Sequence, residues 1–349
     1  MNTYIIAEIG QNHNGDIEIA KKLIDVASIP VFDFFSGVML PGVNAVKLTR
    51  RDLSEEFTDE SANLPYVSPH SFGQTYLEHR KALELTLEQH QELEKYAHAK
   101  GLEFIETLCS PKTLDILDVS RIDRVKIASR DITNVPLLNA LAEIPHPLIL
   151  STGMCSEKEL REALRILRAR KPGREISLLH CISQYPAEYH NINLLSVPYL
   201  KKTFPECPIG YSDHSIGIMV PVVAVALGAT IIEKHITLNR NMKGADHAGS
   251  LEAEGLWRMV RDIRNVELAL GEEKKEYNAA VDDNRRRLGR SLALAVPLKQ
   301  GETLKETYLC MRSPGNGLAW VEREKLIGKK AVRDIPANSL IHLSDFQVE

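Results

Sequence analysis

The segment TLEQHQELEKYAHAKGLEFIETL, residues 86–108, contains one helix followed by one strand. Thr86 and Gln89 have the spacing of a capping box, and Gly101 is a typical residue for the end of a helix. The apolar run LEFIETL (102–108) has the length of a buried strand. A helix that precedes a buried strand is the repeating unit of α/β proteins with a parallel sheet.

The same alternation extends in both directions from this segment. Helical periodicity is present from Glu18 to Ala27, from Glu157 to Arg170 and from Ile216 to Leu227. Eight apolar runs within about 270 residues predict a (β/α)8 TIM barrel, whereas an open doubly wound sheet, the alternative, needs no eighth strand. The eight runs are residues 4–9, 44–49, 102–108, 124–129, 147–152, 175–181, 207–212 and 229–235.

The composition limits the classes of protein to be considered. The 349 residues are 44% hydrophobic and 26% charged, as in folded proteins, and the net charge of −4 offers no basic surplus for nucleic acid. No apolar run reaches the about 20 residues that span a bilayer, and no signal peptide is recognisable, so we expect a cytoplasmic protein without a membrane partner. The cysteines lack a CxxC pair, which predicts buried free thiols. They are Cys109, Cys155, Cys181, Cys207 and Cys310.

The C-terminal part of the chain differs in character from the rest. We predict a barrel domain over residues 1–270, a charged linker over 271–288, and a small β-rich module over 289–349, where apolar runs alternate with Gly, Pro and Asn turns. Two insertions lie early in the barrel: an irregular segment at 28–42, to which we assign no role, and a polar loop at 50–73. Long loops on a barrel rim often form lids or binding elements.

Polar side chains gather at the C-terminal ends of the predicted strands, where a barrel holds its active site. Two lysines, several hydroxyls and turn amides favour an anionic small-molecule substrate, because phosphate and carboxylate oxygens require many donors. The alternative is structural ion pairing of Lys47 and Lys126 with Glu8 or Asp131. The strand-end residues are Glu8, Lys47, Thr107, Lys126, Ser129, Asp131, Ser151, Ser183, Ser212, His214 and His235.

Two of these residues have the character of metal ligands. His214 and His235 follow adjacent strands at equivalent depths, which places both imidazoles within reach of one divalent ion, although a single histidine at a strand end usually makes an ordinary polar contact. An ordinary polar contact is the alternative for each. The segment GADHAGSLE (244–252), which contains Asp246, reads by itself as a loop. No P-loop or GxGxxG motif follows a strand, so the sequence does not support nucleotide binding.

Taken together, the motifs resemble the sialic acid synthase (N-acetylneuraminate synthase) family. The resemblance implies a TIM barrel with a C-terminal antifreeze-like (SAF) domain, and an enzyme that condenses phosphoenolpyruvate (PEP) with a six-carbon sugar. It also implies a divalent metal, usually Mn²⁺ with Mg²⁺ or Co²⁺ as alternatives, and a homodimer in which each SAF domain covers the partner's barrel. The motifs are AEIGQNHNG (7–15), VKIASRD (125–131), LSTGM (150–154), HCISQYPA (180–187), IGYSDHS (209–215), EKHITL (233–238), KGADHAGSLE (243–252) and SPGNG (313–317).

The resemblance also implies roles for individual residues. His214 and His235 match the family's metal ligands, and Glu8, Asp131 and Asp246 match carboxylates around the sugar and the reacting centre. The positions that match the PEP-binding set are Lys47, Thr107, Lys126, Ser129, Ser151, Ser183 and Ser212.

The sequence departs from the commonest bacterial pattern in its sugar-binding elements. Many bacterial members that use N-acetylmannosamine carry Arg immediately before PGNG, whereas here that position is Ser313 and Arg312 is displaced by one residue. Residues 65–90 resemble the members that use sugar 6-phosphates, and four side chains there or nearby are candidates for a second phosphate. These four are His70, His79, Arg80 and Lys243, and a solvated loop is the alternative for each. Arg312 is a further candidate for a contact with the sugar.

The sequence therefore leaves more than one sugar substrate to consider. We predict a mannose-type substrate, N-acetylmannosamine or mannose, as the free sugar or its 6-phosphate. A synthase of deaminated sialic acid (KDN) or its 9-phosphate, and a legionaminic or pseudaminic acid synthase, are the enzymatic alternatives. A non-catalytic carbohydrate-binding protein with the same fold is the alternative from a different class.

Overall fold

The computed structural model describes residues 2–34 and 36–347 of the chain. The chain divides into two compact units, residues 1–271 and 272–349. Each unit has its own cluster of buried apolar side chains.

The first unit is built on eight parallel strands that close into a barrel. Each strand pairs with its neighbours in the order β1-β10-β9-β8-β7-β6-β5-β4, and β4 pairs with β1 to complete the circle. The TIM barrel predicted from the eight apolar runs is confirmed, and the open doubly wound sheet is excluded. The strands are β1 (Tyr4–Gly10), β4 (Ala45–Arg50), β5 (Glu103–Leu108), β6 (Arg124–Ile127), β7 (Leu148–Ser151), β8 (Ile176–Cys181), β9 (Ile209–Asp213) and β10 (Ile231–His235).

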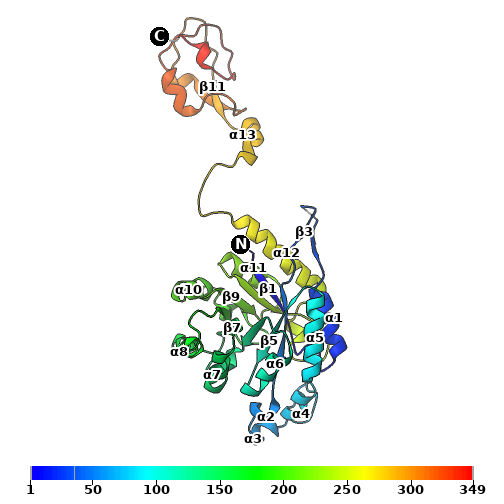
Figure 1. Ribbon diagram of the computed structural model, residues 1–349. Coiled ribbons are helices and arrows are strands. Elements are labelled where there is room, and N and C mark those ends of the chain that lie inside the picture. The colour runs from blue at the N-terminus through cyan, green and yellow to red at the C-terminus, as the bar shows by residue number, and fades with distance from the viewer. Residues whose placement is uncertain (1, 35, 348–349) are drawn as a thin grey trace. The chain divides into compact units, whose positions relative to one another are not determined.

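Helices surround the barrel on its outer side, as Figure 1 shows. The capping box predicted for the second long helix is present: the Thr86 side chain accepts from the Gln89 amide, and the Gln89 side chain accepts from the Thr86 amide. The helices of this layer are α1 (Ile17–Ala27), α5 (Leu87–Ala99), α6 (Ile116–Val119), α7 (Val135–Glu143), α8 (Glu157–Arg168), α9 (Tyr189–Ile192), α10 (Ser196–Thr203), α11 (Met219–Ala226) and α12 (Ala253–Leu270).

The barrel interior is layered, because every second residue of a strand points inward. Near the N-terminal ends of the strands lies an apolar layer that closes the bottom of the barrel. Two residues further along the same strands the inward side chains become polar, and these form the floor of the site described below. The apolar layer consists of Ile6, Ala45, Ile105, Ile149, Leu179 and Ile231, packed with Tyr4.

The two insertions are more regular than the sequence suggests. Segment 28–42 forms a hairpin of β2 (Val31–Asp33) and β3 (Val38–Leu40). The loop predicted at 50–73 instead contains two single-turn helices, α2 (Leu53–Glu56) and α3 (Asp59–Ala62), and is followed by α4 (Tyr76–Lys81). Side chains of Asp52 and Thr58 cap the first two. Such short helices carry too little periodicity to be recognised in a sequence.

The second unit has a small apolar core around the antiparallel pair of β11 (Ser291–Leu294) and β12 (Leu309–Arg312). Isolated bridges and 3₁₀ turns supply the rest of its structure. The segment predicted as a linker contains the short helix α13 (Asp282–Leu288), which has no buried residue. Its exposed side chains agree with the charged composition of that segment.

Two further expectations can be compared with the structure. In the described part of the chain, no helix is both long and apolar enough to cross a membrane. All five cysteines are free, as predicted, but only Cys109, Cys181 and Cys207 are buried. Cys155 and Cys310 are half-buried, so the expectation of burial was wrong for these two.

Candidate active site

A cavity of about 380 Å³ opens at the C-terminal ends of the barrel strands. Most of the residues predicted to form the site line it, although they come from segments distributed over most of the barrel sequence. The predicted residues in its wall are Glu8, Lys47, His79, Arg80, Thr107, Lys126, Ser129, Ser151, Ser183, Ser212, His214, His235 and Asp246. Asp131, His70 and Lys243 are not in its wall, and Arg312 belongs to the second unit.

The floor of the cavity is a layer of buried charges. Lys47 Nζ lies 2.6 Å from Glu8 Oε2 and 3.7 Å from Glu233 Oε2, and it donates to Thr107 Oγ1 at 3.0 Å. Lys126 Nζ lies 3.5 Å from the other Glu233 oxygen. Each of these charged side chains is at most 6% exposed. Two cations and two carboxylates therefore share one space from which water is largely excluded.

These environments separate the two carboxylates in acidity. Burial raises the pKa of Glu8 above its ordinary value, and the Lys47 charge offsets this only in part. Burial acts on Glu233 in the same direction, but Lys126 and Lys47 together hold its pKa below the ordinary value. Burial also lowers the pKa of Lys126. Neighbouring carboxylates whose pKa values are shifted in opposite directions are a feature of sites that transfer protons.

Glu233 was missed by the sequence reasoning. It precedes His235 by two residues on β10, so the period of the strand places both side chains on the inner face. Ser212 Oγ donates to its Oε1 at 2.9 Å, and its Oε2 has no hydrogen-bond partner in the described structure. The same period could have identified Glu233 once His235 was accepted as a site residue.

Hydroxyl groups form one wall of the cavity, and Gly153 contacts two of them. The Gly153 amide donates to Ser129 Oγ at 3.0 Å, and a Cβ added at Gly153 would lie 2.7 Å from Ser183 Oγ. Any side chain at Gly153 would therefore displace these hydroxyls. Ser151 Oγ is buried without a partner in the described structure. An anion with several oxygens suits such a group of unfilled donors.

His214 and His235 lie side by side with ring centroids 5.6 Å apart. His214 Nδ1 donates to the Ile182 carbonyl at 2.8 Å, which leaves its Nε2 as an acceptor. His235 Nδ1 is buried without a hydrogen-bond partner in the described structure, and burial lowers the pKa of this imidazole. Two adjacent imidazoles that each keep a ring nitrogen available suit one divalent ion, so the residues present fit a metal. Among the described residues, no group of three or more His, Cys, Asp or Glu side chains forms a complete metal site, which leaves the remaining positions to water or substrate.

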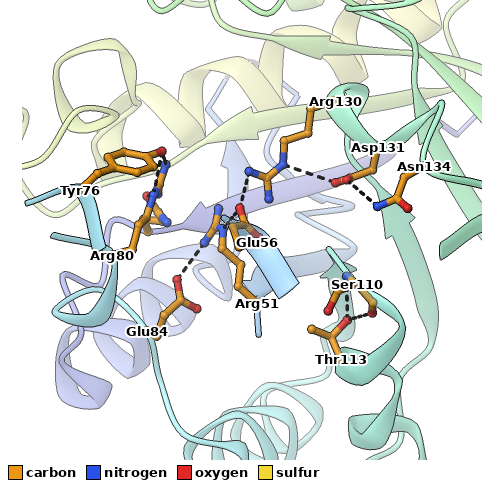
Figure 2. A network of polar contacts seen from close by, with 11 residues as sticks. Arg51, Glu56, Tyr76, Arg80, Glu84, Ser110, Thr113, Arg130, Asp131 and Asn134 are labelled. Atoms are coloured by element: carbon orange, nitrogen blue, oxygen red, sulfur yellow. Dashed lines mark hydrogen bonds and ion pairs between the residues drawn. The ribbon is translucent and has the colours of Figure 1, made fainter. Parts of the chain in front are cut away.

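Figure 2 shows Arg51 and Arg130, two arginines of the cavity lining that the sequence analysis did not single out, within a network of ion pairs. Arg130 lies 2.5 Å from Glu56 and 3.4 Å from Asp131, and Arg51 lies 3.6 Å from Glu56 and 3.1 Å from Glu84. Both guanidinium groups line the cavity but are already matched with carboxylates. The network explains why Asp131 lies outside the cavity wall, because its carboxylate faces Arg130 and Asn134.

Arg80 differs from these two arginines. Its guanidinium donates to Gln11 Oε1 at 2.7 Å and to the Tyr76 hydroxyl at 2.7 Å (Figure 2), and it lines the cavity. No carboxylate of the described residues lies within ion-pair distance of it. Arg80 is therefore a cavity cation whose charge is not matched by a direct carboxylate partner.

The other sugar-phosphate candidates are placed less favourably. His79 is buried among Tyr66, Phe72 and Tyr76, and burial lowers its pKa, so it is a neutral member of an aromatic cluster. His70 Nδ1 accepts from the Gly244 amide at 3.4 Å.

Lys243 Nζ lies 4.7 Å from the centre of the Phe72 ring. In the second unit, Arg312 donates to Asn338, and Ser313 Oγ accepts from Arg290 at 3.0 Å.

Comparison with known proteins identifies relatives over nearly the whole chain. The N,N'-diacetyllegionaminic acid synthase of Campylobacter jejuni is 35% identical, over 97% of this chain and 98% of the relative. The human N-acetylneuraminate-9-phosphate synthase is 33% identical, over 97% of this chain and 91% of the relative.

Solved structures agree with these relatives. The crystal structure of an N-acetylneuraminic acid synthetase from Leptospira borgpetersenii, in complex with citrate, matches with a TM-score of 0.67 and 32% identity. The match covers 81% of this chain and 90% of that one. The models of the NeuB family and of the SAF domain match residues 38–275 and 289–347. The chain therefore belongs to the NeuB family and is a PEP-dependent synthase with a TIM barrel and a C-terminal SAF domain.

Proposed function

We propose that the protein condenses PEP with a mannose-type six-carbon aldose to a nine-carbon 3-deoxy-2-ulosonic acid and releases phosphate. The observation that carries the proposal is the single cavity that joins the two buried lysines, the hydroxyl wall and the histidine pair. A cavity with this lining suits a small anion on one side and a metal-bound oxygen on the other.

PEP is proposed to bind above the buried charges. Lys47 and Lys126 supply positive charge, and Thr107, Ser129, Ser151, Ser183 and Ser212 supply hydroxyls for its phosphate and carboxylate oxygens. Burial strengthens such charge-assisted hydrogen bonds, because no water competes for the oxygens.

In the proposed reaction, the methylene carbon of PEP attacks the aldehyde carbon of the open-chain sugar and forms the new carbon–carbon bond. Water adds to the second carbon of PEP, the carbon–oxygen bond to phosphate breaks, and a 2-keto acid remains. The developing positive charge at the second carbon is stabilised by nearby carboxylates. Glu8, with its raised pKa, is the candidate for the group that accepts the proton of the attacking water.

His214 and His235 are the residues proposed to hold a divalent ion, with Mn²⁺ as first choice and Mg²⁺ or Co²⁺ as alternatives. When bound there, the ion would polarise the aldehyde oxygen of the sugar. Asp246 lines the main cavity and also a smaller pocket together with both histidines, and it is proposed to contact the sugar. The predicted role of Asp131 at the reacting centre stays a prediction, because its carboxylate is turned toward Arg130.

We propose further that the preferred sugar carries a 6-phosphate. Arg80 supports this proposal, because its guanidinium reaches the cavity without a carboxylate partner. A sugar phosphate can form a charge-assisted hydrogen bond to Arg80 without breaking an ion pair that this arginine already makes. A relative named for a 9-phosphate product is consistent with this assignment, and a relative named for legionaminic acid keeps the neutral-sugar alternative open.

Phosphate release measured with N-acetylmannosamine, mannose and the 6-phosphate of each tests the proposal. We expect a higher kcat/KM for each phosphorylated sugar than for its parent, and turnover of the mannose pair at least to a measurable extent. Turnover of mannose 6-phosphate above that of N-acetylmannosamine 6-phosphate would assign the KDN 9-phosphate alternative. A clear preference for unphosphorylated N-acetylmannosamine would contradict the assignment of the phosphate.

A pair of variants locates the phosphate contact. Arg80→Met should remove most of the preference for phosphorylated sugars and leave turnover of the parent sugars nearly unchanged. Lys81→Met is the matched control, because Lys81 lies next to Arg80 on α4 but is exposed and not part of the cavity wall. Equal effects of the two substitutions would show that Arg80 does not bind the phosphate.

We also propose that the protein is a homodimer. A homodimer in which the SAF domain of one chain covers the barrel of the other would exclude water from the cavity during the reaction. A cytoplasmic location, and the lack of nucleic-acid and membrane partners, stay predictions from the sequence.

A further inference from the structure

A buried ion pair lies directly behind the two histidines of the cavity. Asp213 precedes His214 on β9, Lys234 precedes His235 on β10, and these two residues are opposite partners in the strand register. Lys234 Nζ lies 2.6 Å from Asp213 Oδ2, and neither side chain is exposed. Side chains alternate along a strand, so Lys234, which lies between Glu233 and His235, points out of the main cavity together with its partner Asp213, while both histidines line that cavity.

Further hydrogen bonds tie this pair to the chain on both sides of His214. The Asp213 carboxylate accepts from the Tyr211 hydroxyl at 2.9 Å, and from the amide and the hydroxyl of Ser215 at 3.0 Å each. Lys234 Nζ also donates to the Ser215 carbonyl. One lysine of β10 therefore holds the residue before His214 and the residue after it.

Stability alone does not account for such a pair. The cost of removing two charges from water is large, and apolar side chains of the same volume often serve as well or better in a core. Neither residue lines the main cavity, and Asp213 borders only a small pocket beside the two histidines. There its carboxylate is already held by Lys234, Tyr211 and Ser215, so a direct contact with the proposed substrates does not explain the pair either. The pair links two strand ends that are each followed or completed by an imidazole.

We infer that Lys234 and Asp213 are positioning residues, which hold His214 and His235 at the spacing and orientation that one divalent ion requires. The ring separation of 5.6 Å then depends on a cross-strand ion pair as well as on the backbone hydrogen bonds of the barrel. Partners that orient metal-ligating side chains typically affect metal affinity by about 10- to 100-fold. The inference rests on the metal assignment of the proposed function.

The test measures Mn²⁺ affinity by titration calorimetry and stability by chemical denaturation in the same proteins. We expect Lys234→Met and Asp213→Asn each to bind Mn²⁺ at least about 10-fold more weakly than the unmodified chain. The double variant removes both charges, so it should recover stability relative to either single variant. It should not recover Mn²⁺ affinity, since no cross-strand tie replaces the pair.

A second buried ion pair provides the control. Arg264 and Glu267 on α12 are 3% and 7% exposed, and Arg264 also donates to the Thr3 and Pro41 carbonyls, near the N-terminal ends of β1 and β4. Arg264→Met should lower stability and leave Mn²⁺ affinity unchanged.

Two outcomes have different meanings. If the unmodified chain binds Mn²⁺ no better than a His214→Ala variant, the metal assignment of the proposed function is wrong. If it binds Mn²⁺ through the histidines, but the folded double variant binds it within twofold of the unmodified chain, the positioning role is overturned.

Discussion

Glu8 and Glu233 face the same ammonium group, that of Lys47, yet the barrel gives the two carboxylates opposite acidities. Glu233 is within 4 Å of two lysines and Glu8 of only one. Burial raises the pKa of both carboxylates, and only at Glu233 do the lysine charges outweigh this effect. At the pH of the cell, Glu233 is an anion that balances the lysines. Glu8 is the carboxyl group that can exchange a proton.

Glu8 makes stability depend on pH. Its pKa is raised from 4.5 to about 7, so between these values the folded protein keeps a proton that the unfolded chain releases. Stability should therefore fall as pH rises from about 4.5 to about 7 and change no further above it, as far as Glu8 contributes. Between pH 5 and pH 8, the free energy of unfolding should fall less for Glu8→Gln than for the unmodified chain, as measured by denaturation curves at the two pH values. The same loss in both proteins would disprove the raised pKa.

Lys126 is predicted to bind PEP. Lys126→Met removes a buried cation and about 1.5–3 kcal/mol of charge-assisted bonding, so PEP affinity should fall 10-fold or more. Titration calorimetry measures this directly. Lys158→Met, on the exposed face of α8, is the control and should bind PEP normally. Unchanged PEP binding by Lys126→Met would contradict the role.

His235 is predicted to be required for metal-dependent turnover. His235→Ala should abolish turnover and weaken Mn²⁺ binding, while the far-ultraviolet circular dichroism stays that of the unmodified protein. The fold is expected to survive because the His235 side chain only completes the cavity wall above a closed barrel. Full activity of this variant in buffer from which metal has been removed by chelation would show that the metal assignment is wrong.

The C-terminal unit is predicted to act in turnover. A chain that ends at Gly271 keeps the entire barrel with its core, so it should fold. It should lose most activity, because the proposed cover over the cavity is missing and water enters freely. Sedimentation analysis of the full chain should show a dimer. Normal turnover by a stable truncated protein would exclude the covering role.

The sequence by itself determined the repeating architecture. The capping box at Thr86, the stop at Gly101 and the eight apolar runs are local patterns, and each persists in the structure. The C-terminal ends of the predicted strands also singled out Glu8, Lys47 and Lys126 as candidate site residues, and all three line the cavity. Family motifs then attached roles to positions that periodicity alone leaves equivalent.

Only the tertiary structure decided which side chains meet. Glu233 reaches Lys47 and Lys126 because barrel closure brings β10 close to β4, with only β1 between them, and leaves β6 facing β10 across the interior. No local pattern encodes these distances. The cavity wall contains Arg130 and not its neighbour Asp131, which was the predicted site residue. The Arg130 guanidinium pairs with Glu56, which lies 74 residues earlier in an insertion. A sequence encodes the face on which a residue lies, but contacts across a closed barrel arise only when all eight strands are in place, since each depends on the register of every pairing between them.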